Sequence, residues 1–111
     1  MPILKIQTGE AIEDPEAFMQ DATHLLSELL QKPEKYIMII PDQKNILFGG
    51  ETSPAAWCEL KSIGLQEHRT PELSAALSAF LEERLKIPKD RIYIEFTNSE
   101  RHLLGWNGGT F

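Results

Sequence analysis

The sequence repeats itself after about half its length, and this repeat limits the possible folds more than any other feature. Residues 30–39 (LQKPEKYIMI) align with residues 85–94 (LKIPKDRIYI) at an offset of 55, with one leucine, one proline and two isoleucines in the same places. A repeated segment indicates that one supersecondary unit is used more than once. A chain of 111 residues has the length of one domain. We therefore predict a single domain with pseudo-repeats at about residues 2–50 and 57–106.

Each half is predicted to fold as a strand, a helix and a second strand. Asp14 and Thr70 are the expected N-caps of the two helices, because a proline follows each of them and apolar residues then recur at helical spacing. Both helices are expected to end before a proline, at Pro33 and Pro88. The strands are expected at residues 3–7, 36–40, 58–63 and 91–96.

Right-handed crossovers then define the fold class. We predict an α/β (α+β) fold, in which two tandem β-α-β units form a four-stranded mixed sheet with both helices on one face. Residues 36–40 are apolar without alternation, which is typical of a strand that is covered on both faces. Two helices cover only one face, so a second copy of the chain is expected to cover the other. Residues 45–49 and 102–106 are expected to form short edge strands that pair with a neighbouring subunit.

The charge balance excludes several classes of partner. The chain has 17 acidic and 11 basic side chains, a net charge of −6, and no cluster of lysine or arginine. It is therefore a poor candidate for binding nucleic acid or an anionic membrane surface. There is no apolar stretch of about 18 residues and no ordinary secretion signal. A cytoplasmic location is expected, and unconventional secretion stays open.

Cysteine and histidine provide no predicted metal or redox centre. Cys58 is the only cysteine, so an internal disulfide and a thiolate zinc site are both excluded. It is interpreted as a small buried residue. His24, His68 and His102 lack the spacing of metal ligands. We expect no metal.

Pro2 is the strongest candidate for acid–base chemistry. Aminopeptidases generally remove an initiator methionine that precedes proline, which leaves a secondary amine at the N-terminus. An α-amino group has a pKa of about 7.7–8.0, and apolar surroundings lower it because they disfavour the charged form. The neutral amine could then abstract a proton at pH 7. Retention of Met1 would convert the Pro2 nitrogen into a tertiary amide and prevent this. Met-Pro is also a common chain start, so the residue alone leaves an ordinary explanation open.

Short motifs along nearly the whole chain carry a family resemblance. They are Pro2, Lys32-Pro33, Tyr36-Ile37, Pro41-Asp42-Gln43, Phe48-Gly49-Gly50, Ser62-Ile63-Gly64, Asp90-Arg91-Ile92-Tyr93-Ile94, Gly105-Trp106-Asn107 and Thr110-Phe111. In their order and spacing the chain resembles the macrophage migration inhibitory factor family of the tautomerase superfamily. The resemblance implies a homotrimer with active sites between subunits. It also implies a cofactor-independent isomerase of the phenylpyruvate or dopachrome tautomerase type, whose substrate is a small aromatic α-keto or enol carboxylic acid.

The resemblance also implies roles for single residues. Pro2 corresponds to the catalytic base, Lys32 to the lysine that contacts the substrate carboxylate, and Ile63 to a backbone contact in the pocket. The aromatic residues of the pocket or its rim correspond to Tyr36, Tyr93, Trp106 and Phe111, with Tyr93 expected from the adjacent subunit. On spacing alone these aromatic residues are equally expected in a core or an interface.

Two departures from the family pattern leave other functions open. Glu95 stands where the mammalian factor has an asparagine near the substrate, and a carboxylate there repels an anionic substrate. Ala55 replaces the first cysteine of a Cys-x-x-Cys motif, so the dithiol chemistry of a thiol oxidoreductase is not expected. The main alternative to a tautomerase is a non-enzymatic, cytokine-like or interaction protein that retains the fold.

Overall fold

The two predicted β-α-β units are present and share one sheet. The computed structural model describes all 111 residues. Its strands and helices are β1 (Ile3–Thr8), α1 (Pro15–Leu30), β2 (Met38–Gln43), β3 (Ala56–Ile63), α2 (Thr70–Leu85), β4 (Ile92–Ser99), β5 (Gly105–Trp106) and β6 (Gly109–Thr110). Four 3₁₀ turns complete the chain, at Glu34–Tyr36, Glu67–Arg69, Lys89–Arg91 and Arg101–Leu103.

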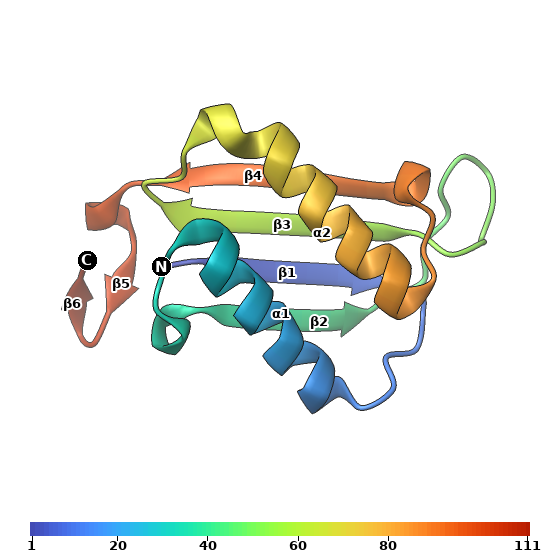
Figure 1. Cartoon of the computed structure of the whole chain (residues 1–111), viewed down its shortest axis with the longest axis horizontal. Helices are drawn as coiled ribbons and strands as arrows, with labels where there is room; N and C mark the ends of the chain where they lie inside the picture. Colours follow the sequence, from blue (N-terminus) through green and yellow to red (C-terminus); the bar gives the residue numbers. More distant parts are fainter.

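The sheet topology confirms the predicted fold class. The four long strands have the order β2-β1-β3-β4. β1 pairs parallel with β2, β3 pairs parallel with β4, and β1 and β3 join the two units antiparallel. Both helices lie on the same face of this mixed sheet (Figure 1). No helix has the length and the apolar character needed to cross a membrane.

The hydrophobic core lies between the helices and the sheet. Leu4 and Ile6 of β1 and Leu60 of β3 are buried against Phe18 and Leu26 of α1 and several leucines of α2. Complete burial of one such side chain stabilises the fold by roughly 1.5–3 kcal/mol. The opposite face of the sheet has no cover within the chain, and Met38, Ile40 and Tyr93 are 49%, 39% and 59% exposed there. The expected cover on both faces of β2 is therefore not provided by a single chain.

The helix ends agree with the sequence prediction except at the start of α2. Asp14 caps α1 as predicted, because its carboxylate accepts a hydrogen bond of 3.2 Å from the Ala17 backbone N–H. Thr70 is not a cap, since it is the first helical residue of α2 and its hydroxyl donates to the Glu67 carbonyl. Both helices end before the prolines, as predicted, and the left-handed residues Gln31 and Lys86 follow their last turns with φ angles of 55° and 59°.

The predicted edge strands are largely replaced by other structure. Within residues 45–49 only Phe48 forms a bridge, with nearby Glu51, so the predicted strand is absent. Residues 101–103 form a 3₁₀ turn, and Gly105–Trp106 pairs with Gly109–Thr110 in a hairpin. Asn107 and Gly108 have φ of 54° and 78°. An Asn-Gly pair with two positive φ angles is the preferred turn of a two-residue hairpin, a signal that the sequence prediction did not use.

Candidate active site

The candidate catalytic proline lies at one end of the sheet. Pro2 directly precedes β1, is less than 2% exposed, and accepts a hydrogen bond of 3.0 Å from the Met38 backbone N–H. Because β3 is antiparallel to β1, with Ile3 opposite Lys61, the end of β3 at Ile63 lies at the same end of the sheet. The N-terminus and the C-terminal hairpin also lie together at this end (Figure 1).

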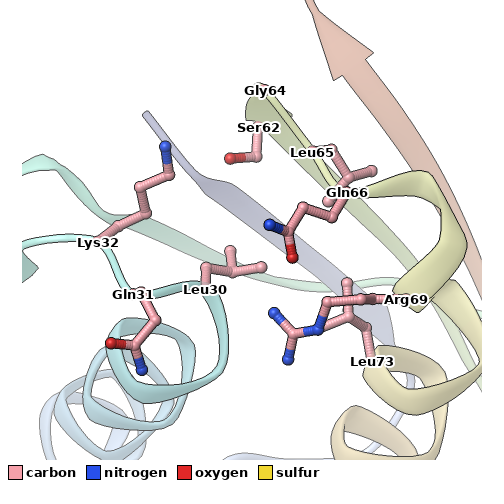
Figure 2. A pocket seen from close by; sticks show the side chains of 9 residues that line it. All are labelled: Leu30, Gln31, Lys32, Ser62, Gly64, Leu65, Gln66, Arg69 and Leu73. Carbon is pink, nitrogen blue, oxygen red and sulfur yellow. The ribbon is translucent and has the colours of Figure 1, made fainter.

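Lys32 approaches the same place from the end of α1. Its ammonium lies 3.5 Å from the Ile63 carbonyl and forms no ion pair with any carboxylate of the chain. Figure 2 shows Lys32 on one side of a cavity, with Gln66 and Arg69 across from it. This cavity measures about 130 Å³ and Pro2 does not line it. Pockets for small-molecule ligands typically measure about 300–1,000 Å³, so one chain alone does not enclose the predicted site.

The electrostatics at this end favour a neutral amine. The pKa of the terminal amino group, which belongs to Met1 here, is lowered by burial, then by the charge of Lys32, and then by Arg101. The Pro2 nitrogen is one peptide unit away, and consecutive Cα atoms are about 3.8 Å apart. The same two cations therefore act on a Pro2 amine, and they disfavour its protonated form.

Three of the predicted aromatic residues form one cluster beside the N-terminus. The ring of Trp106 stacks on Phe111 with centroids 5.3 Å apart and planes at 24°. Tyr36 meets Trp106 and Phe111 edge-on, at 5.7 and 6.2 Å. Such pairs stabilise by about 0.5–1.5 kcal/mol beyond the area they bury. The turn before β2 and the C-terminal segment thus provide an aromatic wall, defined as Tyr36, Trp106 and Phe111.

Tyr93 and Glu95 do not join this group within the chain. The sheet register places Tyr93 beside Trp57, and Trp57 beside Gln7 of β1. The position of Gln7 lies about 17 Å along the strand from Pro2, and Tyr93 lies about 10 Å further across the sheet. Glu95 on β4 is likewise separated from β1 by β3. Neither side chain can reach the Pro2 of its own chain.

Tyr93 instead contacts the loop that joins β2 to β3. Its ring lies 4.9 Å from that of Phe48, and the Arg91 guanidinium lies 4.9 Å from the Phe48 ring centroid. Arg91 also donates hydrogen bonds of 2.9 to 3.3 Å to the carbonyls of Phe48, Glu51, Ser53 and Pro54. Arg91 was predicted only as part of a family motif. No spacing in the sequence indicates that it contacts these loop carbonyls.

Cys58 and the histidines provide no reactive centre at this site. Cys58 is buried on β3, and burial raises the pKa of its thiol to about 12. A buried thiol of this kind is chemically inert at neutral pH because the thiolate is the reactive form. The structure contains no group of three or more histidine, cysteine, aspartate or glutamate side chains that could hold a metal ion.

Comparison with known proteins agrees with this fold. The family model of macrophage migration inhibitory factor matches residues 1–111. A macrophage migration inhibitory factor homolog of Trichinella spiralis is 39% identical over the full length of both chains. The factor of Mus musculus is 37% identical, over 100% of this chain and 99% of its own.

Solved structures give the same result. The crystal structure of a homologue from Prochlorococcus marinus superimposes with a TM-score of 0.93 and 41% identity, over 98% of each chain. The factor from Trichinella spiralis gives a TM-score of 0.93 and 34% identity, over 98% of this chain and 99% of its own. Fold and sequence together define a protein of the tautomerase superfamily. Within that superfamily, the chain belongs to the macrophage migration inhibitory factor family.

Proposed function

We propose that the chain is a keto–enol tautomerase in which the amine of Pro2, freed by removal of Met1, is the general base. The observation that carries the proposal is a buried proline next to the N-terminus, close to the place where burial and the charge of Lys32 lower the pKa of the Met1 terminal amine. A base that is neutral near pH 7 can accept a proton and return it. The proposed substrate is a small aromatic α-keto or enol carboxylic acid, and the reaction requires no cofactor.

The proposed reaction is a transfer of one proton between carbon and oxygen. Lys32 binds the substrate carboxylate as a point positive charge, and the aromatic wall packs against the apolar part of the substrate. The Pro2 amine removes the proton from one end of the enol–keto system, and the resulting ammonium donates it to the other end. The substrate is isomerised and the base is restored, so no other reactant takes part.

We further propose a homotrimer in which a neighbouring subunit supplies Tyr93 and Glu95 to each site. Two observations support this arrangement. These side chains cannot reach the Pro2 of their own chain. The uncovered face of the sheet also exposes Met38 and Ile40, apolar residues that a second subunit would remove from water.

Replacement of Pro2 by glycine tests the role of the base. Pro2→Gly replaces the secondary amine by a primary one and removes the ring, so phenylpyruvate turnover is expected to fall by about 10²-fold or more. Circular dichroism and mass measurement in solution establish that fold and assembly are unchanged. Turnover equal to that of the parent chain, with Met1 removed from both samples, would exclude Pro2 as the base.

A second candidate function is that of a non-enzymatic interaction protein. The observation in its favour is Glu95, because a carboxylate at a site for an anionic acid weakens substrate binding. A natural partner whose binding is unchanged in Pro2→Gly would support this function. Thiol oxidoreductase activity is disfavoured, since the one cysteine is buried with a thiol pKa of about 12.

A further inference from the structure

Arg101 is a cation at the N-terminal end of the sheet that the family resemblance did not include. It begins the 3₁₀ turn Arg101–Leu103, between β4 and the C-terminal hairpin. Arg69 and Arg84 are paired with the carboxylates of Glu72 and Asp21, but Arg101 has no such partner. Its Nε instead donates a hydrogen bond of 3.2 Å to the main-chain oxygen of Phe111.

This hydrogen bond completes a clamp on Phe111. The Phe111 backbone N–H donates to the Leu104 carbonyl at 3.1 Å, so the residue is held through both its nitrogen and its oxygen. The held ring stacks on Trp106 and meets Tyr36 edge-on. Arg101 therefore adds a second main-chain anchor to Phe111, the last member of the aromatic wall.

The charge of Arg101 also acts on the N-terminus. After burial and Lys32, Arg101 is the third cause that lowers the pKa of the terminal amine. The turn after β4, the hairpin and the N-terminus lie together at one end of the sheet (Figure 1).

We infer that Arg101 is a positioning residue of the proposed active site: it holds Phe111 in the aromatic wall and keeps a positive charge close to the proline amine. This inference rests on the proposed function. The two roles are separable. Any cation at this position supplies the charge, whereas the hydrogen bond to Phe111 requires the reach and the planar guanidinium of arginine.

Three variants of the full chain, each with Met1 removed, test the inference. Arg101→Gln removes both the charge and the hydrogen bond to Phe111, whereas Arg101→Lys keeps only the charge. Arg84→Gln is the control, because it removes an arginine from the last turn of α2. The Pro2 amine is titrated directly by NMR of labelled proline. The kcat and KM for phenylpyruvate are measured across the same pH range.

The expected results differ for each variant. In Arg101→Gln the amine pKa rises, so the gain in kcat/KM with pH occurs at higher pH, because the base acts in its neutral form. Its KM rises about fivefold, the scale of one lost hydrogen bond. In Arg101→Lys the KM rises in the same way, but the amine titrates as in the parent chain. In Arg84→Gln neither the KM nor the amine pKa changes.

An Arg101→Gln chain with the amine titration and the KM of the parent would overturn the inference. If the titration moves as expected and no variant turns over phenylpyruvate, the charge effect of Arg101 is supported and the tautomerase proposal fails. The two ideas are thereby tested separately.

Discussion

At the scale of single residues, Lys32 links substrate binding to the basicity of the amine. Its ammonium has no carboxylate partner in the chain and is the largest charge effect on the terminal amine. Lys32→Gln should therefore raise the amine pKa, which moves the pH at which activity appears upward. It should also raise the KM for phenylpyruvate about tenfold, since a charge-assisted hydrogen bond to the carboxylate is lost.

Lys35→Gln is the matched control for that prediction. Lys35 lies over the Tyr36 ring at 5.1 Å but is not among the groups that affect the terminal amine. We expect this variant to keep the pH profile of the parent chain, measured as kcat/KM against pH. The same pH shift in both variants would mean that overall charge, rather than Lys32, controls the amine.

The sequence predicts those residues that belong to a family motif. It does not predict residues whose importance lies only in their contacts in the folded chain. Pro2 lies at the same end of the sheet as Ile63, which Lys32 contacts, and the role of these residues in a site stays a prediction. Arg91 and Arg101 were not predicted to make contacts, because their partners are main-chain oxygens of loops. A carbonyl is present at every residue, so no sequence pattern identifies which one an arginine contacts.

At the scale of secondary-structure elements, the two helix starts should differ in stability. Asp14→Ala should reduce the free energy of unfolding by about 1 kcal/mol, because it removes an N-cap. Thr70→Ala removes only a hydroxyl bonded to a carbonyl of the preceding turn, so a smaller loss is expected. Urea unfolding of both variants makes the comparison, and a larger loss for Thr70→Ala would contradict the capping described here.

Arg91 should control the order of the loop between β2 and β3. Its guanidinium is bonded to four loop carbonyls, so Arg91→Ala leaves them without this partner. We expect a loss of about 1–3 kcal/mol in the free energy of unfolding. Amide hydrogen exchange in residues 44–55 should become faster while exchange in the helices is unchanged. Equal acceleration in loop and helices would instead indicate a general loss of stability.

The strands and helices were predictable where a regular spacing of apolar residues stops at a recognisable residue, such as a proline. The strands and helices were found because their apolar spacing is regular, although β2 begins two residues later than predicted. The helix ends before Pro33 and Pro88 were predicted, but the left-handed conformation of Gln31 and Lys86 was not, because this conformation favours glycine in general. The predicted strand at 45–49 failed because the edge it was expected to pair with is absent from one chain.

At the scale of the whole molecule, the uncovered face of the sheet should determine self-association. Ile40 lies near the middle of β2 on that face and is 39% exposed in one chain. Ile40→Glu should weaken the proposed trimer, since it introduces a charge where a subunit interface would be dry. Sedimentation velocity measures the assembly, and phenylpyruvate turnover should fall with it because Tyr93 and Glu95 would no longer reach a neighbouring Pro2.

A substitution on the helix-covered side provides the control for that experiment. Lys89 is exposed at the turn before β4, and its ammonium pairs with Glu82 of α2 at 4.0 Å. Lys89→Glu should leave both the assembly and turnover unchanged. A monomeric parent chain that is fully active would contradict the proposed shared site.

The most direct test of the central claim is phenylpyruvate tautomerisation by a sample whose intact mass shows that Met1 is absent. Turnover well above a matched buffer control is expected, with activity that rises with pH as the amine loses its proton. A sample that retains Met1 is expected to be inactive. No turnover by assembled protein with a free Pro2 amine would exclude the tautomerase and favour the interaction protein.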